Sequence, residues 1–137
     1  MINKTLVGKI KQNNMKIEVS IGEIVDKLSI LQIKTEFIKD EEKLNNVKKE
    51  YDYLYDIVFN EMKIEQSDFS DMVSINQELW DIEDDIRDKE RDKEFDEEFI
   101  RLARAVYVTN DKRAEVKKGI NLKYGSEFTE EKSYNPY

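Results

Sequence analysis

Apolar residues recur at steps of three and four along four stretches of the chain, and this period predicts four amphipathic α-helices. The first apolar face contains Ile21, Ile24, Val25, Leu28, Leu31 and Ile38, and the second contains Leu44, Val47, Tyr51, Leu54, Val58 and Met62. The third contains Met72, Ile75, Leu79, Ile82 and Ile86, and the fourth begins with Phe99, Leu102 and Val106. Because such helices bury their apolar faces against each other, the pattern predicts an all-α, four-helix bundle-like fold.

Local signals indicate where these helices begin and end. Ser20 is followed three residues later by Glu23, which is the capping-box pattern, so the first helix should begin there. Asp40 is the expected cap of the second helix. The last helix should run from about residue 96 to about residue 122, with Gly125 as its stop signal.

We expect a single domain, because the chain has 137 residues. Residues 1–14 should form a basic mobile arm, residues 15–125 the helical domain and residues 126–137 a C-terminal tail. Residues 16–19 alternate in character and should be extended, and residues 64–71 should connect the second and third helices. The tail has no helical period, and we expect it to pack on the bundle through its aromatic residues Phe128, Tyr134 and Tyr137.

Composition supports the helical fold and narrows the choice of partners. Four glycines, one proline and 39% charged residues favour helices over a turn-rich β-sandwich. The net charge of −8 argues against bulk binding to nucleic acid or to an anionic membrane, so we expect neither partner. Because the chain has no long apolar run and no signal-peptide pattern, we expect a cytoplasmic protein.

Cysteine and histidine are both absent. Disulfides, zinc–thiolate sites and thiol nucleophiles are therefore excluded. Any proton transfer would use carboxylates, lysine, tyrosine or water, and any metal would be an oxygen-preferring ion such as Mg²⁺. We expect no cofactor, or Mg²⁺ if the protein is an enzyme, and the sequence leaves open whether it is one.

The apolar stripe of the last predicted helix continues as polar residues. Asn110, Arg113 and Lys117 follow its apolar residues at the same spacing. If the stripe still faces the interior, the two cations need carboxylates or an anionic ligand, because an unpaired buried charge is costly. If it faces solvent, the acidic segment 78–98 and the basic segment 101–123 simply pair at the surface.

The first alternative predicts an anion-binding site between the helices. Arginine suits bidentate contact with phosphate or carboxylate, lysine adds a point charge, and asparagine both donates and accepts. Two aromatic residues could stack on a ring of the ligand, although aromatics at helical spacing more often belong to the core. The predicted ligand-binding residues are Lys27, Lys34, Trp80, Arg87, Arg104, Tyr107, Asn110, Arg113 and Lys117.

Carboxylates at E-x-x-D spacing indicate a second kind of site. Glu23 and Asp26 share one face of the first predicted helix, and Glu83 and Asp84 belong to the third. Four such carboxylates could hold Mg²⁺. In a chain with 31 acidic residues this spacing also arises by chance, so the metal set is the alternative prediction.

The first predicted helix has a second face that mixes charges with large apolar groups. This face contains Glu23, Asp26, Lys27, Ile30, Ile33, Lys34 and Phe37. A solvated helix face rarely carries three such apolar residues. We therefore expect a homodimer, or another homo-oligomer, that covers it.

Four strings in a fixed order resemble a known family. They are "SIGEIVDKLSILQIK", "LWDIEDDIR", "RAVYVTNDKRAEVKKGIN" and "EEKSY". From about Met15 to the C-terminus, the chain resembles small uncharacterised proteins of bacteria and tailed phages that are catalogued as a domain of unknown function. The resemblance implies that these strings form the family signature, and it implies no activity.

Two partial resemblances do imply activities. The E-x-x-D spacing is similar to that of the all-α nucleoside triphosphate pyrophosphohydrolases, which hold Mg²⁺ over a nucleotide, but a clear second E-x-x-D motif is missing here. The first and last predicted helices are similar to those of chorismate mutase, an all-α dimer that binds a dicarboxylate with Arg and Lys. Its leading Arg has no counterpart before "IVDKL".

These observations lead to three functional hypotheses. The first is a protein that binds an anionic small molecule, phosphorylated or carboxylated and including nucleotides, without catalysis; in a phage-infected cell it would sequester a host metabolite or signal. The second is a Mg²⁺-dependent nucleotide pyrophosphohydrolase. The third is a structural or adaptor protein that has no ligand.

Overall fold

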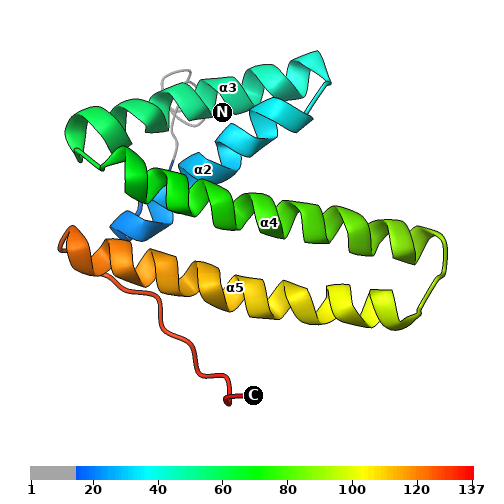
Figure 1. The fold of residues 1–137 in the computed structure, drawn as a ribbon. Helices are drawn as coiled ribbons and strands as arrows, with labels where there is room; N and C mark the ends of the chain where they lie inside the picture. Colours follow the sequence, from blue (N-terminus) through cyan, green and yellow to red (C-terminus); the bar gives the residue numbers. More distant parts are fainter. Residues whose placement is uncertain (1–14) are drawn as a thin grey trace, which may run out of the picture.

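The computed structural model describes residues 15–137, which form four packed α-helices (Figure 1). These are α2 (Ile21–Phe37), α3 (Glu41–Tyr55), α4 (Gln66–Arg91) and α5 (Glu97–Lys123). The helix α3 continues directly into a π-helical segment, η1 (Asp56–Glu61). The described residues contain no strand, so the predicted all-α, bundle-like fold is confirmed. The expected basic arm, residues 1–14, lies outside the described residues.

The two predicted helix caps and the predicted start of the last helix near residue 96 are confirmed. At the start of α2, the Ser20 hydroxyl accepts a hydrogen bond from the Glu23 amide at 3.2 Å. The carboxylates of Asp40 and Asp96 accept amide hydrogen bonds in the same way at the starts of α3 and α5. Each cap satisfies an amide that has no partner within its own helix, so local sequence is sufficient to specify these three starts.

The start of α4 differs from the prediction. The sequence pattern predicts a connection over residues 64–71, but α4 already begins at Gln66. Phe69 is buried in the same apolar cluster as Met72, and its burial extends the inner face of α4 by one turn. The chain changes direction just before this helix, at Lys63, whose φ of 58° lies in the left-handed region.

The central helix of the fold is α2, which packs against α3, α4 and α5. Leu28 of α2 and Met72 of α4 are fully buried in the main apolar cluster. Asp26 and Ile33, which belong to the second face of α2, are buried as well. The face that predicted a homodimer is therefore covered in part within one chain, whereas Phe37 stays 45% exposed, and the homodimer stays a prediction.

The N-terminal turn of α2 lies unusually close to α5. The Gly22 amide donates to Asn121 Oδ1 at 2.6 Å, and a Cβ at Gly22 would lie only 2.7 Å from the carbonyl oxygen of Lys117. The neighbouring Ile21 amide donates to Ser126 Oγ at 3.1 Å, just beyond α5. Glycine permits this approach because it has no side chain. The close contact places the first turns of α2 directly against Lys117.

The two longest helices, α4 and α5, form an antiparallel hairpin whose loop end extends beyond α2 and α3 (Figure 1). At the loop, Lys89 Nζ lies 2.9 Å from carboxylate oxygens of both Glu94 and Asp96. At the end of α2, the ring of Phe37 stacks on Trp80 of α4, with 5.4 Å between centroids. Among residues 15–137, no helix has the length and apolar character required to cross a membrane.

The tail after α5 runs back along that helix (Figure 1). Its Lys132 and Tyr137 both contact the Asp111 carboxylate, at 3.1 Å and 2.6 Å. The aromatic side chains that were expected to pack the tail on the bundle stay largely exposed: Phe128 is 48% exposed and Tyr134 is 82% exposed. Polar contacts, together with an edge contact between the rings of Tyr137 and Tyr107, therefore hold the tail against α5.

Candidate functional site

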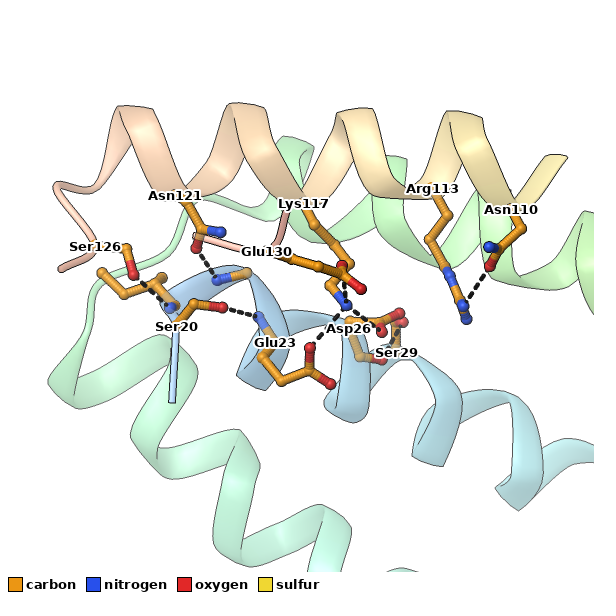
Figure 2. Close-up of polar contacts among 12 residues, drawn as sticks. Ser20, Glu23, Asp26, Ser29, Asn110, Arg113, Lys117, Asn121, Ser126 and Glu130 are labelled. Carbon is orange, nitrogen blue, oxygen red and sulfur yellow. Dashed lines mark hydrogen bonds and ion pairs between the residues drawn. The ribbon is translucent and has the colours of Figure 1, made fainter. Parts of the chain in front are cut away.

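One face of α5 presents a row of polar side chains to α2 and α4. Figure 2 shows Asn110, Arg113, Lys117 and Asn121 in this row, each separated from the next by three or four residues. Lys117 is only 5% exposed, and Arg113 is half-buried. The alternative in which this stripe faces solvent is therefore wrong, because the α5 register keeps it turned toward the other helices.

Lys117 is neutralised by the acids of this chain (Figure 2). Its Nζ lies 2.7 Å from Glu23 Oε2, 3.1 Å from Glu130 Oε2 and 3.6 Å from Asp26 Oδ2. Burial alone would lower the pKa of Lys117, but the hydrogen bonds to Glu23 and Glu130 and the charge of Asp26 raise it above its usual value of 10.5. Lys117 therefore remains an ammonium with all of its charge compensated.

Asn76 of α4 links this cluster to the next cation. Its Nδ2 donates to Asp26 Oδ1 and to Ser29 Oγ, both at 2.7 Å. Its Oδ1 accepts from Arg113 Nη1 at 3.4 Å. Asn76 is 4% exposed, so these bonds satisfy a buried amide at the junction of α2, α4 and α5.

Arg113 has a very different environment from Lys117. Its Nη2 donates to Asn110 Oδ1 at 2.6 Å, and its Nη1 donates to the side-chain oxygen of Asn76. Within residues 15–137, no carboxylate lies within ion-pair distance of this guanidinium. A guanidinium carries five N–H donors, so Arg113 keeps donors and an uncompensated charge.

Arg113 lies at a groove of about 540 Å³ between α4 and α5. Apolar and aromatic groups form much of its wall, and charged groups lie at intervals along it. The groove is lined by Ile30 of α2, by Asn76, Leu79, Trp80, Glu83, Asp84 and Arg87 of α4, and by Val106, Tyr107, Asn110 and Arg113 of α5. We refer to this surface as the α4–α5 groove.

The structure brings together five of the predicted ligand-binding residues. The groove contains Trp80, Arg87, Tyr107, Asn110 and Arg113. The others do not line it. These are Lys27, whose ammonium lies 3.4 Å from Glu50 of α3, together with Lys34, Arg104 and Lys117. An α-helical period gives the direction of a residue but not the helix that lies opposite it, so this division needed the tertiary structure.

Sequence reasoning missed several groove residues. Leu79 and Val106 were assigned to apolar faces and Ile30 to the mixed second face of the first helix, and Asn76 was not selected as a site residue. Asn76 carried a usable signal, because it lies four residues after the core residue Met72, where another apolar side chain would be expected. It is the same signal that identified Asn110.

The predicted metal set is not assembled. Glu23 and Asp26 contact Lys117, whereas Glu83 and Asp84 lie in the α4–α5 groove, where Glu83 is 3.2 Å from Arg87. No group of three or more acids within residues 15–137 has an arrangement that could hold a metal ion. The E-x-x-D spacing placed Glu23 and Asp26 on one helix face, but that face and the one carrying Glu83 and Asp84 lie against different partners.

The two aromatic candidates both contact other aromatic rings. Trp80 stacks on Phe37, and Tyr107 makes an edge contact with Tyr137 of the tail, at 5.3 Å between centroids. Both side chains still line the groove. These contacts fix the orientation of the two rings and leave them as part of an apolar wall.

Comparison with known proteins identifies the family of this chain. The model of a family of unknown function (DUF6165) matches residues 15–137, which is nearly the whole chain. No curated protein and no solved structure matches it significantly. The predicted resemblance to an uncharacterised family is therefore confirmed, including its start at Met15. The chain belongs to the DUF6165 family, whose function is unknown.

Proposed function

We propose that this protein binds a small molecule with a carboxylate or phosphate group in the α4–α5 groove, without catalysing a reaction on it. The observation that carries the proposal is the half-buried guanidinium of Arg113, which has two amide oxygens as partners and no carboxylate among residues 15–137. Carboxylates and phosphates match the N–H fork of arginine. An anionic ligand would neutralise the charge of Arg113, as carboxylates of the protein neutralise the charge of Lys117.

The rest of the groove suits a small molecule. Its volume of about 540 Å³ lies within the range typical of ligand pockets. Leu79, Trp80, Val106 and Tyr107 provide apolar area, which contributes most of the affinity in such pockets. Asn76 and Asn110 hold the guanidinium through their side-chain oxygens, so the anchoring group is positioned before the ligand arrives.

The other two hypotheses have less support. Hydrolysis with Mg²⁺ would use Glu23 and Asp26 together with Glu83 and Asp84, and these pairs have different partners. A purely structural protein would not need a cation directed into an apolar groove without a carboxylate beside it. Binding therefore remains the function that this geometry favours.

A thermal-shift and calorimetric screen tests the proposal. Inorganic phosphate, short carboxylates and nucleotides would be titrated with and without Mg²⁺, against the original protein, Arg113→Gln and Lys118→Gln. A ligand at 100 times its Kd stabilises the folded state by about 2.7 kcal/mol. We expect metal-independent stabilisation that Arg113→Gln weakens at least tenfold in Kd.

Lys118→Gln is the matched control, because it removes one exposed charge from the same helix. It should leave the response unchanged. Equal binding by Arg113→Gln and the original protein would contradict the proposal, as would the absence of binding by every anion in the screen. Turnover of a nucleotide that requires Mg²⁺ would favour the hydrolase hypothesis instead.

A further inference from the structure

The α4–α5 groove has two ends of different charge. Arg113 reaches the α4 wall at Asn76, where Arg113 Nη1 and Asn76 Oδ1 are 3.4 Å apart. Asp84 lines the groove eight residues further along α4. At 1.5 Å per helical residue, this places Asp84 about 12 Å along the helix from the Arg113 contact. The positive and negative ends therefore face a ligand at different points along its length.

The carboxylates at the second end are not equivalent. Glu83 Oε2 is 3.2 Å from Arg87 Nη2, so Arg87 already compensates it. Asp84 has no hydrogen bond or ion pair with any described residue, although it lines the same groove. Asp84 is exposed and Arg113 is half-buried, but each lines the groove without an ion pair to a described residue, so Asp84 is the acidic counterpart of Arg113.

The wall between these two ends is apolar. Trp80 lies one turn before Asp84 on α4, and Tyr107 lies on the facing part of α5. Phe37 and Tyr137 hold the two rings from outside the groove. A bound molecule would need an uncharged body at this level, because burying charge between apolar walls is costly.

We infer that the ligand is bipolar: a carboxylate or phosphate at the Arg113 end, an apolar body along Trp80 and Tyr107, and a protonated amine or other cationic donor at Asp84. This inference rests on the proposed function and specifies the class of ligand that the groove accepts. A simple dianion fits this arrangement less well, because its second negative charge would approach Asp84.

A pair of linear probes tests the inference. Octanoate carries a carboxylate and an apolar body, and 8-aminooctanoate adds an amine at the far end. We expect 8-aminooctanoate to bind about fivefold more tightly than octanoate, as an exposed ion pair allows. The advantage should shrink at high ionic strength, because salt screens exposed charges.

Two conservative variants test which end of the probe binds at Asp84 and which binds at Arg113. Asp84→Asn should remove the preference for 8-aminooctanoate while leaving octanoate binding intact, and the neighbouring exposed Asp85→Asn is its matched control. Arg113→Gln should weaken both probes. Thermal unfolding of each variant establishes that it is folded before titration.

The possible results separate this inference from the proposed function. If both probes bind equally and need Arg113, the bipolar ligand is rejected and anion binding stands. The bipolar ligand is also rejected if Asp84→Asn keeps the preference for the amine. If neither probe binds, this inference is overturned; if inorganic phosphate, short carboxylates and nucleotides also fail, the proposed function is rejected with it.

Discussion

Lys117 and Arg113 lie one helical turn apart on α5, and both point toward the other helices, yet their surroundings differ. Lys117 contacts three carboxylates that come from α2 and from the tail. Arg113 contacts two amide oxygens, from Asn76 and Asn110. The comparison indicates that a buried cation becomes structural when the fold supplies its anions, and becomes a candidate ligand anchor when the fold does not.

The largest expected effect comes from removing the compensated cation. Lys117→Met should destabilise the protein by about 3–5 kcal/mol, because it leaves the buried Asp26 without its cation. Urea denaturation measures this loss. The double variant Lys117→Met, Asp26→Asn should recover part of it, since no buried charge is then left unpaired. A loss below about 1 kcal/mol in the single variant would show that the cluster does not stabilise the fold.

The pH dependence of the original protein sharpens this result. The pKa of Lys117 is raised above 10.5, so its contribution to stability is fully present below pH 10.5 and is lost as the pH rises through the folded-state pKa. The difference in free energy of unfolding between the original protein and Lys117→Met should therefore be constant from about pH 7 to about pH 9. A steady decline of that difference over this range would show that the ammonium is not held as described.

The next effect tests the contact that brings α2 against Lys117. Gly22→Ala should destabilise the fold by about 1–3 kcal/mol, because the new Cβ would lie 2.7 Å from the Lys117 carbonyl oxygen and the two helices must move apart. Gly119→Ala is the control on the same helix pair: a Cβ there has no neighbour within 4 Å, and alanine favours helix by about 1 kcal/mol. Chemical denaturation should show opposite signs for the two variants.

A more exposed ion cluster on α5 should give a smaller effect. Lys123 Nζ lies 2.7 Å from Asp68 Oδ2, and the hydrogen bonds from Lys123 and Tyr124 hold the pKa of Asp68 below 3.8. A lowered carboxylate pKa stabilises the fold above the unfolded value, and that stability is lost as the pH falls through the folded value. Asp68→Asn should cost at most about 1 kcal/mol at about pH 7, and the cost should shrink as the pH falls below 3.8, when both are measured by urea denaturation.

The smallest change in stability should come from Arg113 itself. Arg113→Gln removes two hydrogen bonds to amide oxygens and no ion pair among the described residues. The free energy of unfolding, obtained from thermal unfolding, should therefore fall by less than about 1 kcal/mol. Its main consequence should appear in the ligand titrations. A loss of stability as large as that of Lys117→Met would show that Arg113, like Lys117, stabilises the fold. The two cations would then not differ in role.

The part of the fold that sequence could predict is the part governed by local interactions. Ser20, Asp40 and Asp96 begin their helices because a side chain a few residues away from an amide can cap it, and that distance is visible in the sequence. The apolar period of α5 also indicated, as one of two alternatives, that its polar stripe faces the other helices. The burial of Asp26 and Ile33 on the second face of α2 could not be predicted in this way, because α4 and α5, which pack against α2, lie far along the chain.

The candidate site shows the same limit. The sequence pattern predicts Lys117 and Arg113 as members of one site, and it offers no way to separate residues four positions apart on one stripe. What separates them is the position of Glu23 and Glu130, which lie 94 residues before Lys117 and 13 after it. The E-x-x-D pair at Glu23 and Asp26 was predicted to hold Mg²⁺, and in the structure these carboxylates lie against the ammonium of Lys117.

The hydrogen bond from Ile21 to Ser126 spans 105 residues and joins the first turn of α2 to the chain just beyond α5. During synthesis α2 leaves the ribosome before α5, which is the helix that buries its charged side. Until residues through Lys117 have emerged, Asp26 has no cation opposite it, and the apolar side of α2 can contact only α3 and α4. The nascent protein therefore acquires its native centre only after α5 has been synthesised, and it depends on remaining unaggregated until then.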